Sequence, residues 1–161
     1  MTTYGPDAHY LTAQEATLDL FKSLNAAVEI VADHKLGKPL GMSLADARPA
    51  LAESVRSGRS LRNVQLDLEA GAALYRAGMD AYVRDVAKDP ALASAIAQGF
   101  GKTITDAKAI SMPVETAVRD SSRRAAVEKT QRDAAALKTL LAQKLSPALG
   151  IPVGFNALDG D

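Results

Sequence analysis

The sequence of 161 residues contains no cysteine and no tryptophan, and aromatic residues make up only 4% of it. Without cysteine the chain forms no disulfide bond, and thiolate metal sites and cysteine nucleophiles are excluded. Four tyrosines and three phenylalanines offer little surface on which nucleic-acid bases or sugars would stack. These absences leave the cellular compartment open, but they exclude thiol chemistry as a function.

The chain also has no excess of charge of either sign. Nineteen lysine and arginine residues balance nineteen aspartate and glutamate residues, so the formal net charge is zero. A domain that binds nucleic acid normally carries a basic surface, and we therefore expect no nucleic-acid partner. No stretch approaches the ~20 apolar residues that a membrane-spanning helix needs. We expect membrane attachment only through an anchor that is absent from this chain.

What the sequence does contain is apolar residues at helical spacing. Thr12 and Glu15 form a capping-box pattern, which predicts that a first helix begins there. Gly37 followed by Pro39 predicts its end, because glycine favours the left-handed cap and proline cannot continue the hydrogen-bond ladder. Further helices are expected from Ser60 as N-cap to near Gly78, from Asp89 and Pro90 to Pro113, and from about Ser121 to just before Pro147.

Each of these four segments carries one apolar stripe at three- and four-residue steps, and no alternating strand pattern accompanies them. We therefore predict an all-α fold, an antiparallel four-helix bundle with a long loop after the first helix and an irregular C-terminal tail. No interior linker interrupts the pattern, so residues 1–161 are expected to form a single helical-bundle domain. The stripes comprise Leu18, Phe21, Leu24, Val28 and Val31, then Leu61, Val64, Leu68, Ala72 and Tyr75, then Leu92, Ile96, Phe100, Ile104, Ala107 and Ile110, and finally Val127, Ala134, Leu137, Leu141 and Leu145.

A catalytic metal pair in a helical bundle needs glutamate and histidine three residues apart on facing helices, and the sequence lacks that spacing. Thr12 stands three residues after His9, and Gly37 stands three residues after His34. His34 is expected near the end of the first helix, where the helix dipole favours a cation, and His9 is expected in a loop. Ser57 has no histidine nearby in sequence, which argues against a nucleophilic serine. We predict no metal ligand and no catalytic residue.

The strongest candidate for a binding site is the segment around the start of the second helix. Guanidinium groups beside free helix amides could hold a carboxylate or a phosphate there. The alternative is a solvated arginine face that pairs with Glu53, Asp67 or Glu69. The arginines that recur at three-residue steps are Arg56, Arg59 and Arg62. The predicted ligand-binding residues are Glu53, Ser54, Arg56, Ser57, Arg59, Ser60 and Asn63, together with Asn156, Asp159 and Asp161 in the tail.

The three polar tail residues offer oxygen ligands of the kind that calcium takes, but the twelve-residue loop with its closing glutamate is missing. Packing of the tail through Phe155 and Leu158 is the alternative interpretation. We also predict that residues 156–161 lie beside the three arginines. In an up-and-down bundle this arrangement requires the long loop after the first helix to cross back along the bundle.

The sequence ends in a pattern that resembles the C-terminal signature of the imelysin-like family, which includes iron-regulated proteins and proteins classed as metallopeptidases. The matching residues are Gly154, Phe155 and Asn156, followed by Asp159, Gly160 and Asp161. Residues 35–41, and residues 53–61 leading to Leu74 and Tyr75, are similar to the C-terminal half of that family in the same order. The resemblance covers nearly the whole chain.

The resemblance implies a bacterial envelope protein, periplasmic or associated with the outer membrane, built of two helical halves with a site between them. The family's proposed metal motif, glycine-x-histidine-x-x-glutamate, belongs to the N-terminal half. It is absent here, because Gly5 and His9 have the wrong spacing and Thr12 replaces the glutamate. The resemblance therefore implies no cofactor in this chain, iron or zinc in the full-length protein, and the N-terminal half of the same protein as partner.

Three functions are compatible with these residues. The first is a binding or structural half-domain of an envelope protein in metal acquisition, with iron as the metal. The second is a component of a metallopeptidase whose metal motif lies in the N-terminal half, and the chain alone is then not expected to cleave peptides, because a catalytic metal takes three protein ligands. The third is an anion-binding module for acidic polysaccharide or peptide carboxylates, with the three arginines as the clamp.

Folding of the chain is expected to need no metal. The purified chain should be strongly helical without added metal, because four apolar stripes suffice for a bundle and no ligand cluster takes part. Circular dichroism with and without a chelator measures this. A large loss of helical signal in chelator would reveal a structural metal site instead.

Overall fold

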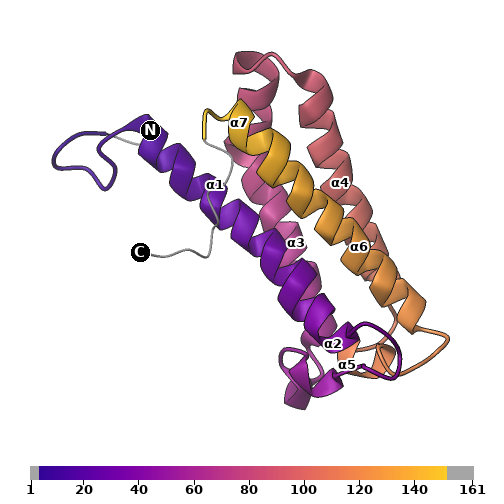
Figure 1. The fold of residues 1–161 in the computed structure, drawn as a ribbon. Helices are drawn as coiled ribbons and strands as arrows, with labels where there is room; N and C mark the ends of the chain where they lie inside the picture. The colour runs from indigo at the N-terminus through magenta and orange to yellow at the C-terminus, as the bar shows by residue number, and fades with distance from the viewer. Residues whose placement is uncertain (1–3, 152–161) are drawn as a thin grey trace.

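The computed structural model describes residues 4–151, whose four long helices form an antiparallel bundle (Figure 1). The first long helix comprises α1 (Ala13–Glu29), the π-helical η1 (Ile30–Gly37) and α2 (Lys38–Leu40). The second comprises α3 (Ser60–Leu74) and the π-helical η4 (Tyr75–Met79) and η5 (Tyr82–Val86). The third is α4 (Pro90–Ala109), and the fourth comprises α6 (Arg124–Leu140), the π-helical η6 (Leu141–Leu145) and α7 (Ser146–Ala148). The connections hold the short helices η2 (Pro49–Leu51), η3 (Val55–Ser57) and α5 (Val114–Ala117).

The long helices surround a core that consists of two clusters of buried residues. α1 lies next to α3 and α6, and α4 contacts the same two helices. Because the chain runs alternately up and down, the connection 41–59 and α5 share one end of the bundle, and α7 lies at the other end (Figure 1). The predicted fold class and the long loop after the first helix are confirmed. The predicted irregular tail lies outside the described residues, and no helix within residues 4–151 has the length and apolar character that a membrane crossing requires.

The helix starts at Thr12 and Asp89 follow the predicted capping chemistry. Thr12 Oγ1 accepts a hydrogen bond from the backbone N–H of Glu15 at 3.1 Å, and Asp89 Oδ1 accepts one from Leu92 N–H at 2.9 Å. The Glu15 carboxylate accepts from the N–H of Leu11 at 2.8 Å. The reciprocal half of the capping box is therefore displaced by one residue, although the helix begins where it was predicted.

Three predicted helix ends are wrong, because the helices continue through the residues that should stop them. The first helix passes Gly37 and Pro39 and ends at Leu40, where Gly41 takes a φ of 60°. The second helix passes Gly78 and continues to Val86, and the fourth passes Pro147 and ends before Gly150.

Wide π-turns explain how the two prolines fit. In η1 the N–H of Lys38 bonds to the carbonyl of Asp33, five residues earlier, and in η6 the N–H of Ser146 bonds to Leu141 in the same way. Both of these π-helical segments end two residues before a proline. A proline inside an α-helix lacks a donor and collides with the carbonyl four residues earlier, and the extra residue of the π-turn shifts that carbonyl out of register.

The predicted apolar stripes form the core. Most of their residues are buried, and Leu18, Leu61, Leu92 and Ile104 are partly buried against it. Close approach between α3 and α4 depends on Gly71, where a Cβ atom would lie 3.1 Å from Phe100 Cε1. Tyr75 stacks on the same ring at a centroid distance of 6.3 Å, and burial raises the pKa of its phenol to about 12. The Tyr75 hydroxyl donates to the carbonyl of Ala93 at 3.4 Å, so its polar atom has a partner inside the core.

Arg124 ties the ends of three elements together. Its side chain is buried, with 6% exposure for the residue. Nη1 donates to the carbonyl of Leu40 at 2.8 Å and to that of Val118 at 3.3 Å, while Nε donates to Glu128 Oε1 at 2.6 Å. The guanidinium therefore satisfies a carbonyl at the end of the first helix, where no further turn supplies a donor.

Replacing Arg124 by methionine is expected to lower the free energy of unfolding by roughly 2–3 kcal/mol, because buried carbonyls that lose their donor cost ~1–3 kcal/mol each. Urea denaturation followed by circular dichroism measures the loss. The matched control is Arg132→Met, on an exposed position of α6, which should change stability by no more than ~0.5 kcal/mol. Equal stability of the two variants would show that the Arg124 contacts contribute nothing.

Candidate functional site

The predicted binding residues from Glu53 to Arg59 lie in the connection 41–59, which hydrogen bonds and ion pairs attach to the bundle. The N–H of Arg48 donates to the carbonyl of Pro39 at 2.8 Å. Lys35 Nζ lies 2.7 Å from Glu53 Oε2 and 2.5 Å from Asp67 Oδ2, so one lysine links the connection to α3. Hydrogen bonding to this lysine is the main cause of a lowered pKa for the Glu53 carboxyl. These contacts therefore hold the connection in a defined position against the bundle.

The serine and asparagine side chains of the predicted site are used within the turn itself. Ser54 adopts a left-handed backbone with φ of 55°. Its hydroxyl accepts a hydrogen bond from Asn63 Nδ2 at 3.1 Å, and its carbonyl accepts one from the Ser57 hydroxyl at 3.0 Å. These groups hold the entry to α3 and are not directed at an open site.

Ser60 has a different role from the predicted one. The residue is 2% exposed, and Arg59 occupies the N-cap position of α3 without a side-chain bond to the helix. The Ser60 hydroxyl accepts a hydrogen bond from the N–H of Val114 at 2.9 Å and donates to the Glu115 carboxylate. The prediction that it caps α3 is wrong, because its side chain turns toward the start of α5 instead.

Of the predicted binding residues, the arginines are the ones whose side chains remain available to bind a ligand. Arg56 and Arg59 are exposed, and their guanidinium groups have no hydrogen-bonded or ion-paired partner within residues 4–151. The carboxylates that a solvated arginine face would use are engaged elsewhere. Glu53 and Asp67 pair with Lys35, and Glu69 pairs with Lys108 at 2.7 Å while lying close enough to Arg62 for a charge interaction.

Exposed apolar residues accompany these arginines, and they were not among the residues predicted from the sequence. Met42 is 95% exposed, and the same connection presents Leu44, Leu51 and Val55 to solvent. A hollow of about 670 Å³ is lined by Met42, Leu51, Lys38 and Arg48 among others. The only signal in the sequence was the presence of large apolar residues in a glycine- and proline-rich loop, at spacings that no helix explains.

The tail part of the predicted site, Asn156, Asp159 and Asp161, lies outside the described residues, and so does its predicted meeting with the arginines. Within the described part, the connection 41–59 stays at the end of the bundle that holds α5 and does not cross back along it (Figure 1). The N–H of Ile151 bonds to Ser146 of α7, and α7 lies at the opposite end of the bundle (Figure 1).

Neither histidine belongs to a metal site in the described part of the chain. His9 lies in the loop before α1, exposed, with its ring edge against Tyr10 at a centroid distance of 4.6 Å. His34 is exposed inside η1, and because the helix continues to Leu40, it lies more than one turn before the helix end. The prediction that His34 interacts with the C-terminal helix dipole is therefore wrong. Residues 4–151 contain no group of three or more potential metal ligands.

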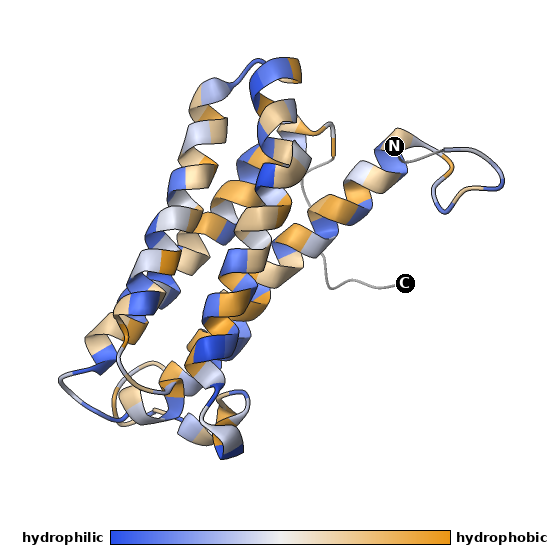
Figure 2. Ribbon diagram, turned by 180° about the vertical axis from the view of Figure 1, so that it is seen from behind, coloured by the Kyte–Doolittle hydropathy of each residue, from blue (hydrophilic) through white to orange (hydrophobic). Residues whose placement is uncertain are grey.

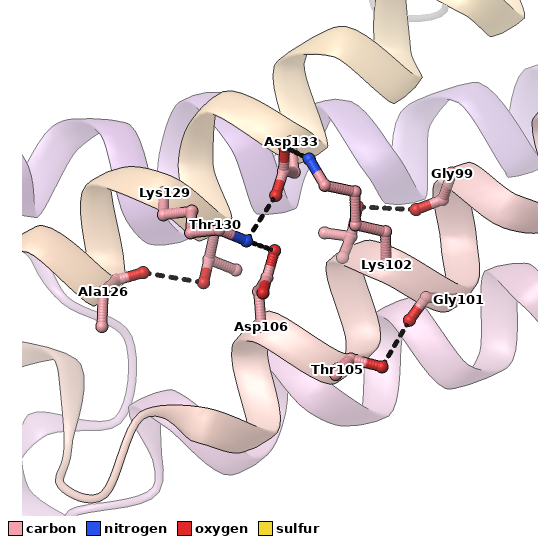
Figure 3. Close-up of polar contacts among 10 residues, drawn as sticks. Gly99, Gly101, Lys102, Thr105, Asp106, Ala126, Lys129, Thr130 and Asp133 are labelled. Carbon is pink, nitrogen blue, oxygen red and sulfur yellow. Dashed lines mark hydrogen bonds and ion pairs between the residues drawn. The ribbon is translucent and has the colours of Figure 1, made fainter.

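The most extensive charged cluster shown between two long helices connects α4 with α6 (Figure 3). Lys102 bonds to Asp133, and Lys129 bonds to Asp106 and lies 3.4 Å from Asp133. Two carboxylates on facing helices could begin a metal site, but here ammonium groups already neutralise them. Hydrogen bonding with Asp106 first, and then with both lysines, lowers the pKa of Asp133 to about 2 against the opposing effect of burial.

Comparison with known proteins gives one match. A family model described as Imelysin, and named as a peptidase family, matches residues 2–143. Searches of the curated proteins and of the solved structures returned no match to the chain.

The α4–α6 cluster predicts a specific acid response. Because the pKa of Asp133 is lower in the folded protein than its ordinary value of 3.8, its stabilising contribution is complete above about pH 4 and is lost as the pH falls toward 2. Asp133→Asn should lower stability at neutral pH and flatten the stability curve in that window, measured by urea denaturation from pH 2 to 7. Asp85→Asn, an exposed residue without an ion pair, is the control and should keep the wild-type curve. A wild-type curve for Asp133→Asn as well would contradict the assignment.

Proposed function

The chain belongs to the imelysin family, and on this basis we propose that it is a binding or structural half-domain of a bacterial envelope protein that takes part in metal acquisition, with iron as the metal. The observation that carries the proposal is the family match, which spans residues 2–143 of 161. In this proposal the protein resides in the periplasm or at the outer membrane, and the partner of this chain is the N-terminal half of the same protein.

The metal itself would be held mainly by that other half. Residues 4–151 do not offer a fitting ligand set, because the two histidines are separate and exposed and the α4–α6 carboxylates are neutralised by lysines. The contribution of this chain would be a rigid surface. The connection 41–59 supports this role, since it is held by internal bonds and still presents Met42, Arg56 and Arg59 outward.

A second candidate, an anion-binding module, is favoured by the pairing pattern around the arginines. Nearby carboxylates pair with Lys35 and Lys108, so that Arg56 and Arg59 keep their donors for an external carboxylate or phosphate. Acidic polysaccharide and peptide carboxylates are ligands of this chemistry. The metallopeptidase alternative would require both the metal ligands and the general base from the N-terminal half.

Deletion of the gene is expected to reduce uptake of radioactive iron by cells grown under iron restriction, and expression of the wild-type protein should restore it. The double variant Arg56→Gln/Arg59→Gln should restore uptake only in part, because it removes the free guanidinium groups that would face the partner half. The matched control is Arg76→Gln/Arg132→Gln, which removes two exposed arginines from η4 and α6, outside the connection 41–59.

Unchanged iron uptake and iron content in the deletion strain would refute the proposal. In that case, salt-sensitive binding of polygalacturonate to the purified chain, lost in the Arg56→Gln/Arg59→Gln variant, would favour the anion-binding module. Cleavage of a peptide library that chelator abolishes, seen with the full-length protein but not with this chain, would favour the metallopeptidase component.

A further inference from the structure

An apolar pocket of about 270 Å³ opens at the end of the bundle opposite the arginines. The N-terminal half of α1 diverges there from the other long helices (Figure 2). Leu20 of α1 forms one wall, and the second long helix forms the other with Leu74, Gly78, Met79 and Tyr82. Leu149, which follows the fourth helix, also lines the pocket.

The lining of this pocket favours an apolar side chain as its occupant. Met79 and Leu149 are each 6% exposed, whereas Leu20 and Tyr82 at the rim remain 45% and 40% exposed. Thr17 also lines the pocket, and its hydroxyl already donates a hydrogen bond to the carbonyl of Ala13 at 2.8 Å. Half-exposed large apolar groups around a concave site mark a place where a partner group is expected to bind.

The chain itself supplies a suitable segment beside the pocket. Ile151 is buried, and its N–H donates to the carbonyl of Ser146 at 2.9 Å while its carbonyl accepts from the Ser146 hydroxyl at 3.1 Å. The chain is thus fixed two residues after Leu149, at the pocket. The ten residues that follow include Val153, Phe155 and Leu158.

We propose that residues 152–161 dock in this pocket, with Phe155 as the apolar anchor. Ten extended residues span at most ~33–36 Å, which is ample for a site beside Leu149. The arginine end is less accessible, because the second long helix from Ser60 to Val86 alone is ~40 Å long at ~1.5 Å per residue. Reach therefore favours the pocket over the arginines as the position of the tail. The proposal is independent of the proposed function.

The first test uses a fluorescent reporter on the rim. The chain has no tryptophan, so Tyr82→Trp gives a single emitter, studied in the full chain and in a variant that ends at Ile151. Truncation should shift the emission of this indole to longer wavelength, and adding a synthetic peptide of residues 152–161 should reverse the shift. Tyr10→Trp, in the loop before α1, is the control and should not respond to truncation.

The second test blocks the pocket in the presence of the native Tyr82. Gly78 and Gly101 are helical glycines at which an added Cβ would meet no atom within 4 Å, but only Gly78 lines the pocket. Gly78→Leu should accelerate chymotrypsin cleavage after Phe155 by roughly tenfold, because cleavage follows the population of undocked tail. Gly101→Leu should leave the rate at the wild-type value.

Equal cleavage rates in wild type, Gly78→Leu and Gly101→Leu, together with an emission of the Tyr82→Trp variant that ignores truncation, would overturn the proposal. A shift that depends on protein concentration and accompanies a dimer in sedimentation would overturn it too, since a second copy would then fill the pocket. Protection of Phe155 that is lost when Arg56 and Arg59 are replaced would place the tail at the opposite end, as the sequence had suggested.

Discussion

The buried guanidinium of Arg124 makes the contacts on which one end of the bundle depends, the end that holds α5 and the connection 41–59. The first helix ends at Leu40, and the next donor along the chain is carried away by the left-handed turn at Gly41. A carbonyl at that position would be buried without a donor, at a cost comparable with a lost hydrogen bond. Arg124 supplies the donor from the start of the fourth helix and also reaches Val118. The end of one helix and the start of another are thus fixed by a single side chain.

Because this end of the bundle is held by specific contacts, the exposed groups of the connection 41–59 can form a binding surface. On a mobile loop, an apolar side chain such as Met42 would pack against the nearest apolar surface. Here the loop is held through Lys35, Asn63 and the backbone of Pro39, so Met42 stays in solvent. A surface that is already ordered loses little conformational entropy when a partner binds. The internal bonds of the predicted site therefore prepare a surface, although they remove several of its polar groups from direct ligand contact.

Local sequence rules predicted the helices and their core faces but failed at three of their ends. The apolar stripes were sufficient because burial depends on spacing, and spacing is readable from the sequence. Gly37, Pro39 and Pro147 were misinterpreted because the stop signals assume an α-helical hydrogen-bond ladder, and the π-turns change its register. At Ser60 the local rule competed with a partner 54 positions away, the N–H of Val114, which no local pattern could reveal.

The same limit explains why the sequence predicted a polar loop at this position but did not resolve the roles of its side chains. Glu53 and Asp67 had two sets of cations to choose from, the neighbouring arginines and the distant Lys35, and only the packed helices decide between them. Lys35 sits between both carboxylates, so this group carries one net negative charge. Salt screens that charge over a Debye length of ~8 Å, so it attracts the arginines weakly without occupying their hydrogen-bond donors. An incoming carboxylate or phosphate can form direct, paired hydrogen bonds to a guanidinium, which a carboxylate already bound to lysine does not offer. Arg56 and Arg59 thus stay exposed and available to an external anion, because Lys35, and neither of these arginines, pairs with Glu53 and Asp67.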